Sequence, residues 1–131
     1  MNNIHDILEI SNTLNFKFPK AFMKTVELNL IDFDIWYILD KERFFKRYMG
    51  LKDRYPTRTL IPFAKRDDCD DVACFELDKP NKVEIIHDFA SEGYEQKKEY
   101  NNFWDWLKSA IDEMIEFNEE EFKYEETNIP S

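Results

Sequence analysis

Apolar residues recur at helical spacing in three places in the first half of the chain. The pattern predicts a short helix over residues 3–11 and a second helix from Pro19, where a missing N–H costs nothing in the first turn. A third helix is expected over residues 40–50, DKERFFKRYMG, with Gly50 as its carboxyl cap. The inner stripes of these helices carry Ile4, Ile7, Leu8, Phe22, Met23, Val26, Leu30, Phe44, Phe45 and Tyr48.

Two segments between and after these helices have the alternation and bulky side chains that are typical of strands. Residues 31–39, IDFDIWYIL, predict a strand or an extended turn. Residues 59–64, TLIPFA, predict a strand in which Pro62 lies near an edge or a bulge.

A β-hairpin is predicted further along the chain. Its strands are residues 71–77, DVACFEL, and residues 82–90, KVEIIHDFA. The tetrad Lys79–Lys82 should form the turn, because proline suits the second turn position and asparagine the third.

The last part of the chain predicts a closing helix. Residues 91–102 form a polar connection, and Asn102 is a good helix cap with Asp105 three residues on. From residue 103 to residue 117 the apolar spacing is helical, and beyond Glu119 a frayed acidic tail is expected.

The order of these elements is that of an α+β fold: N-terminal helices, a small antiparallel sheet with a central hairpin, and a closing C-terminal helix. The 131 residues suit one domain, which we place at residues 1–118, with residues 119–131 as an acidic C-terminal tail. The start of the chain, MNNIHDILEI, has no basic region and no continuous apolar run. We therefore expect no secretory signal and no membrane span. We expect a cytoplasmic protein with free thiols.

The net charge of −10 is unevenly distributed. Residues 41–54 carry six basic and two acidic side chains, whereas residues 112–126 carry eight acidic and one basic. The overall charge disfavours nucleic acid and anionic membranes as partners and favours a basic protein. The acidic carboxyl end has two interpretations, a partner surface or a solvated face that aids solubility.

The sequence offers few candidates for catalysis or for binding of a metal or cofactor. Only two glycines occur, so no dinucleotide fingerprint or phosphate loop can be formed. The cluster RDDCDD, residues 66–71, fits neither a calcium loop nor a zinc motif, and we predict no metal and no cofactor. Cys74 lies in mid-strand, and His87 and Asp88 should point to opposite faces, so we predict no catalytic residue and no enzyme.

The aspartates of this cluster have a simpler interpretation. They lie between two predicted strands, and unpaired aspartates are costly to bury, so the whole cluster is expected to stay exposed. A basic partner would relieve their mutual repulsion. A binding edge and a merely polar turn are equally good interpretations.

Three stretches together resemble the SUKH superfamily: LIPFAKRDDCDDVACFEL (60–77), KVEIIHDFASEGYEQ (82–96) and NNFWDWLKSAIDEMIEF (102–117). FPKAFMKTVEL and IDFDIWYIL are similar to the proline-started helix and the tryptophan segment of that family. The chain departs from the pattern where glycines are usual, in the acidic turn and at NLID. The superfamily comprises α+β domains related to a yeast cell-wall-synthesis regulator, and many bacterial members are similar to immunity proteins encoded beside secreted toxins.

The resemblance implies a cytoplasmic binding protein that neutralises a cognate basic toxin, often a nuclease. Tyr94 beside two glutamates is then a natural anchor, although it is equally suited to covering the hairpin. The predicted partner-binding residues are Asp67, Asp68, Asp70, Asp71, Glu92, Tyr94 and Glu95. Two other hypotheses remain open, a general interaction or regulatory module without a toxin partner, and a small enzyme that uses Cys74 or His87.

Overall fold

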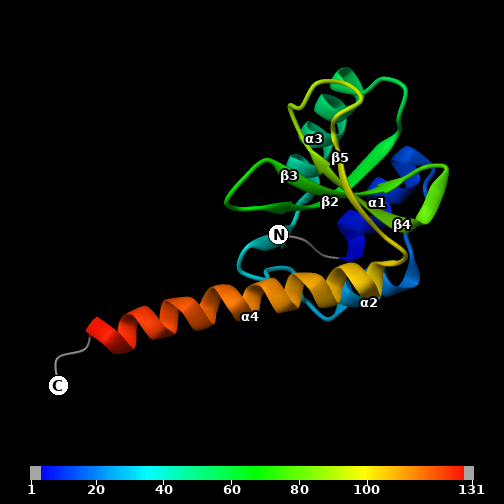
Figure 1. The fold of residues 1–131 in the computed structure, drawn as a ribbon. Helices are drawn as coiled ribbons and strands as arrows, with labels where there is room; N and C mark the ends of the chain where they lie inside the picture. Colours follow the sequence, from blue (N-terminus) through cyan, green and yellow to red (C-terminus); the bar gives the residue numbers. More distant parts are fainter. Residues whose placement is uncertain (1–3, 129–131) are drawn as a thin grey trace.

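The computed structural model describes the backbone of residues 4–128 and the side chains of residues 4–123. Four helices and a five-stranded antiparallel sheet confirm the predicted α+β class (Figure 1). The elements are α1 (Ile4–Leu14), α2 (Lys20–Glu27), β1 (Trp36–Ile38), α3 (Lys41–Arg54), β2 (Leu60–Arg66), β3 (Asp71–Glu76), β4 (Lys79–His87), β5 (Gln96–Tyr100) and α4 (Phe103–Asn128).

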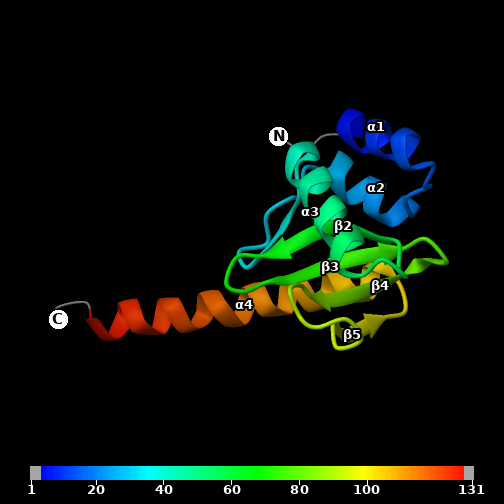
Figure 2. The same cartoon turned by 90° about the horizontal axis from the view of Figure 1, so that it is seen from above.

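The sheet is a meander in which every strand pairs with its neighbour in sequence, in the order β1-β2-β3-β4-β5. Helices cover both of its faces, with α3 on one side and α2 and α4 on the other (Figure 2). Because both faces are covered, all six residues of β3 are buried. The short strand β1 and the polar strand β5 are left as the two edges.

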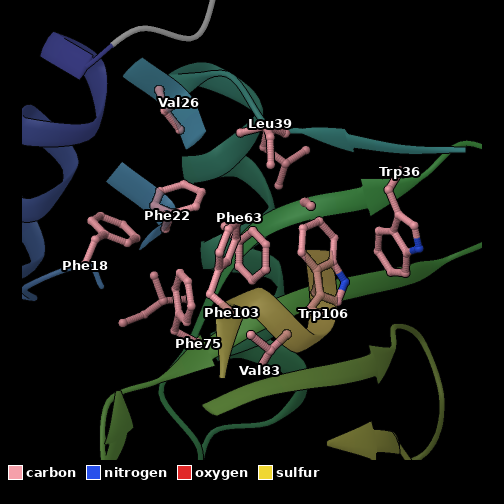
Figure 3. Close-up of a cluster of buried hydrophobic side chains, with 14 of the residues drawn as sticks. Phe18, Phe22, Val26, Trp36, Leu39, Phe63, Phe75, Val83, Phe103 and Trp106 are labelled. Carbon is pink, nitrogen blue, oxygen red and sulfur yellow. The ribbon is translucent and has the colours of Figure 1, made fainter. Parts of the chain in front are cut away.

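Aromatic side chains fill the larger core, between the sheet and helices α2 and α4 (Figure 3). Phe63 lies at the centre, with its ring centroid 4.5 Å from Phe75 and 4.8 Å from Trp106. Phe22 from α2 and Phe103 from α4 pack edge-on to each other at 5.6 Å. A smaller core lies under α3 and consists of Leu51, Tyr55, Leu60, Val72, Cys74 and Ile86.

Several local predictions are confirmed. Pro19 is the N-cap of α2, and the pairing of β2 with β3 shifts register between Pro62 and Ala64, which is the bulge expected there. The Asn102 side chain accepts a hydrogen bond from the Asp105 N–H at 2.9 Å. These features could be predicted from the sequence because they depend on neighbouring residues alone.

The predicted position of the hairpin turn was wrong. Glu76 pairs with Lys79, so the loop is the two residues Leu77 and Asp78, and β4 already begins at Lys79. Pro80 is therefore the second residue of a strand, in an exposed end of it where proline is tolerated. Of the segment 31–39, only Trp36–Ile38 pairs as a strand, and Asp32 bridges back to Tyr37.

Three other boundaries differ from the predictions. The polar connection contains the strand β5, whose polar residues suit an exposed sheet edge and hide the strand pattern. Gly50 is no cap, because α3 continues to Arg54. Helix α4 continues to Asn128 and does not fray at Glu119, and residues 129–131 of the predicted tail lie outside the described residues.

Candidate functional site

The turn between β2 and β3 holds the aspartate cluster, and cations of the same chain pair with two of its four aspartates, Asp68 and Asp71. Arg66 makes a two-pronged pair with Asp68, at 2.8 and 2.9 Å, and these hydrogen bonds lower the pKa of Asp68 to about 2. Lys65 Nζ donates to the carbonyl oxygens of Arg66 and Cys69 at 2.9 and 2.8 Å. Of the described cluster, Asp67 and Asp70 are exposed with no ion pair of their own side chains.

Asp71 is buried, contrary to the prediction that the whole cluster stays exposed. It opens β3, and only 3 % of its surface is accessible. Its carboxylate bonds to Lys97 Nζ at 2.5 Å and to His87 Nδ1 at 2.8 Å. Burial by itself would raise the pKa of Asp71, but the hydrogen bonds from Lys97 and His87 outweigh it and lower the pKa. Pairing thus removes the cost that made burial unfavourable.

Glu95 is also buried, so only part of the predicted glutamate–tyrosine patch is open to a partner. Its Oε2 accepts from Arg58 Nη1 at 2.9 Å, and its Oε1 accepts from the Gly93 N–H at 2.7 Å. Glu92 and Tyr94 are exposed, and Tyr94 is 82 % accessible, so it does not cover the hairpin. Glu95 therefore shapes the loop that presents Tyr94.

The His87–Asp88 pair has a different role from the one considered in the sequence. The two side chains do point apart, as expected, but His87 is exposed and bonds to Asp71. Asp88 is fully buried and binds both Arg47 and Arg54 of α3 at 2.6–2.7 Å. Neither residue orients the other for catalysis.

Asp67 joins three aspartates from another segment around a hollow of about 490 Å³, which we name the acidic hollow. Its lining is Ile31, Asp32, Asp34, Ile35, Tyr37, Ile38, Asp40, Arg43 and Asp67. The turn is held against the 31–40 segment by the Asp67 N–H, which donates to the Ile35 carbonyl at 2.8 Å. In the part of the chain that the structure describes, the side chains of Asp34 and Asp67 have no hydrogen-bond partner.

Local geometry holds the other aspartates of the acidic hollow in place. The Asp32 Oδ1 accepts from the Asp34 N–H at 2.9 Å, which supports the left-handed backbone of Asp34 (φ 45°). Asp40 is the N-cap of α3 and accepts from the Arg43 N–H at 2.8 Å. Sequence reasoning missed Asp32, Asp34 and Asp40. The alternation in IDFD was a signal for the first two, but their convergence with Asp67 depends on the pairing of β1 with β2.

The end of α4 is a second negative surface. It extends past the sheet in both views of the molecule (Figures 1 and 2). Its exposed side chains include Asp112, Glu116, Glu119, Glu120 and Glu121. This end of α4 therefore carries exposed negative charge outside the acidic hollow.

The thiols and the potential metal ligands offer little chemistry in this fold. Cys74 is completely buried, and burial raises the pKa of its thiol well above the usual value, which makes it a poor nucleophile. Among residues 4–123, no three His, Cys, Asp or Glu side chains are grouped to hold a metal ion. Within residues 4–128 no helix combines the length and the apolar character needed to cross a membrane.

The fold and the acidic hollow define an α+β domain with a concave, mainly negative surface. A sequence profile of the SMI1/KNR4 family (SUKH-1) matches residues 3–109, and the chain belongs to this family. No curated protein and no solved structure matched the chain. The profile confirms the resemblance drawn from the motifs, and it ends within α4, before the acidic end of that helix.

Proposed function

We propose that the protein is an immunity protein of a bacterial polymorphic toxin system, and that it binds and neutralises a cognate basic toxin, a nuclease, in the cytoplasm. The observation that carries the proposal is the acidic hollow, in which four aspartates and one arginine line a concave surface. Membership of the SUKH-1 family supports the same conclusion.

The acidic hollow suits a lysine or arginine side chain of the partner. Asp34 and Asp67 have unused carboxylate oxygens there, and a charge-assisted hydrogen bond contributes about 1.5–3 kcal/mol. Isoleucines and Tyr37 in the lining would pack against the aliphatic part of such a side chain. A nuclease surface that grips phosphates is rich in these residues.

The rest of the charge distribution favours fast association with a basic protein. The net charge of −10 and the exposed carboxylates of α4 would steer such a partner over a long range. Asp70, Glu92 and Tyr94 remain exposed and are proposed as contacts at the rim, whereas Asp68, Asp71 and Glu95 act by holding their loops in shape.

The proposal is tested by co-expressing the chain with the toxin domain encoded by the neighbouring gene. We expect a stoichiometric complex that co-purifies, and cells that survive expression of the toxin. The double variant Asp34→Asn, Asp67→Asn should bind at least about tenfold more weakly, because two charge-assisted bonds are lost.

A matched double variant, Asp53→Asn with Asp78→Asn, removes the same charge from exposed positions that lie outside both the acidic hollow and α4. It should bind within about threefold of the wild type. Equal losses in the two double variants would refute the role of the acidic hollow. Absence of both a complex and protection would refute the proposed function, and weak binding to several unrelated proteins without a toxin neighbour would identify a general interaction module instead.

A further inference from the structure

A second hollow, of about 480 Å³, lies beside the acidic one and has the opposite charge. We name it the basic hollow. Its lining is Tyr37, Leu39, Arg43, Lys46, Arg47, Gly50, Arg54, Lys65 and Phe89, which includes five basic side chains and no acidic one. Such a concentration of positive charge is unexpected in a protein whose net charge is −10.

Helix α3 supplies most of this charge from a single face. Arg43, Arg47, Gly50 and Arg54 are spaced by three or four residues and therefore lie one above the other. Gly50 makes room for the last of them, because a Cβ atom there would lie 2.6 Å from Arg54 Nη2. A glycine inside a helix lowers the stability of that helix by about 1 kcal/mol relative to alanine. Gly50 therefore makes α3 less stable but leaves room for the Arg54 side chain in the hollow.

Arg47 and Arg54 are held in place by Asp88, but not all of their N–H donors are engaged. Arg54 donates from Nε and Nη2 to Asp88, and Arg47 donates from Nη1. A guanidinium carries five N–H groups, so each arginine keeps donors that have no partner among the described residues. One carboxylate for two guanidiniums also leaves a net positive charge.

Phe89 is held over these arginines in a strained conformation. Its φ of 69° is a left-handed value that bulky residues rarely adopt, and the residue is 61 % exposed. The guanidinium carbon of Arg54 lies 4.1 Å from the ring centroid and that of Arg47 lies 5.8 Å from it, and the exposure of Phe89 leaves part of the ring open to solvent. Strain that presents an exposed aromatic ring in a charged hollow is typical of binding sites.

Two lysines complete the hollow. Lys46 is exposed and has no ion pair in the described part of the chain. Lys65 also lines the hollow, and its Nζ is anchored by the carbonyl oxygens of Arg66 and Cys69. Among the described residues, Asp40 and Asp88 pair with three of the five cations, so a net positive charge remains in the hollow.

We infer that the basic hollow is a binding site for a phosphate-bearing ligand of nucleotide size. The phosphate would bind Lys46 and the free arginine donors, and the planar base would stack on the exposed part of the Phe89 ring. Guanidinium and ammonium groups are the usual donors to phosphate, and an aromatic face is the usual platform for a base. The volume suits a mononucleotide and is larger than a free phosphate requires.

The inference is independent of the proposed partner, so the full-length chain alone serves for its test. Titration calorimetry and amide NMR would follow binding of adenosine monophosphate, adenosine and inorganic phosphate. We expect saturable binding of the monophosphate with a Kd below about 1 mM, and at least about tenfold weaker binding of the other two. The amide shifts should centre on residues 43–54 and 89.

Two variants locate the site. Lys46→Glu should weaken monophosphate binding by about tenfold or more through the lost charge-assisted bond. Phe89→Asn keeps a residue that tolerates positive φ but removes the ring, and should weaken binding by about tenfold. Lys108→Glu makes the same charge change at an exposed position of α4 and should leave binding unchanged.

Three outcomes would overturn the inference. The first is no saturable binding of the monophosphate. The second is an equal effect of Lys46→Glu and Lys108→Glu, which would show only a response to net charge. The third is tight binding of a glutamate-rich peptide with none of the nucleotide, which would make the basic hollow a contact for an acidic protein segment.

Discussion

Replacement of Asp88 by asparagine tests the main electrostatic link between α3 and the sheet. The Asp88 side chain has no accessible surface and accepts hydrogen bonds from two guanidiniums and from the Phe89 N–H. In Asp88→Asn the amide group presents N–H donors of its own to the arginine donors. The substitution therefore removes the charge and also turns part of the contact from attractive to repulsive.

The magnitude follows from the burial and the number of bonds. Breaking a fully buried ion pair costs about 3–5 kcal/mol. The arginines are 21 % and 30 % accessible and recover some hydration, so we expect the lower end, about 3 kcal/mol. With an m value of about 1.5 kcal/mol per molar urea, the midpoint of unfolding should fall by about 2 M.

The pH dependence gives a second measure of the same interaction. Burial alone would raise the pKa of Asp88, but the hydrogen bonds from Arg54 and Arg47 outweigh it and lower the pKa in the folded state. A carboxyl group with a lowered folded pKa stabilises the protein above its unfolded pKa of about 3.9, and this stability is lost as the pH falls through the folded value. The difference between wild type and Asp88→Asn should therefore be largest near neutral pH and narrow as the pH falls below about 4.

Urea unfolding followed by circular dichroism at several pH values measures both effects. Asp112→Asn is a suitable control, because Asp112 is exposed on α4, and its midpoint should stay within about 0.3 M of the wild type. A loss below about 1 kcal/mol for Asp88→Asn, or a difference independent of pH, would refute the reasoning.

Three further predictions follow from single side chains. Gly50→Ala should not stabilise the wild type in urea unfolding, because the new Cβ atom would lie too close to the Arg54 guanidinium. In the Arg54→Ala variant this guanidinium is absent, and Gly50→Ala should stabilise that variant by about 1 kcal/mol. Equal effects in the wild type and in Arg54→Ala would contradict this. Burial and the neighbouring Glu99 raise the pKa of Glu84 to about 7, above its unfolded value, so the free energy of unfolding of the wild type should rise as the pH falls from about 8.5 to 5.5. Glu84→Gln should be about 2 kcal/mol more stable than the wild type at pH 8.5, and its stability should depend less on pH. A pH dependence that the substitution leaves unchanged would contradict this. A thiol reagent should label the exposed Cys69 in the native protein and the buried Cys74 only after unfolding, and rapid native labelling of Cys74 would revive the enzyme hypothesis.

Local features of the fold followed from the sequence because they depend on neighbouring residues. The α+β class, the starts of α2 and α4 and the bulge at Pro62 were all predicted. Strand β5 was missed because an exposed edge strand carries no apolar alternation. The hairpin turn was misplaced because the register of β3 with β4 selects Leu77–Asp78 over a tetrad with better turn residues.

The candidate site was only partly accessible to the same reasoning. The sequence predicted an acidic turn, with a binding edge and a merely polar turn as equally good interpretations, and in the structure Asp67 of this turn lines a hollow. The three other aspartates of the acidic hollow come from a segment about 30 residues away, and only the pairing of β1 with β2 brings them together. The basic hollow was visible only as a run of basic residues in α3.

The sequence by itself determined the periodicity, the element order, the family and the overall charge, because each of these is a property of local pattern or of composition. Tertiary structure alone decided which carboxylates are exposed and which stabilise the fold. Asp71, Asp88 and Glu95 are buried because cations 26, 41 and 37 residues away in the chain meet them. A charge is buried only where a partner offsets the loss of water, and the position of that partner is a property of the folded chain.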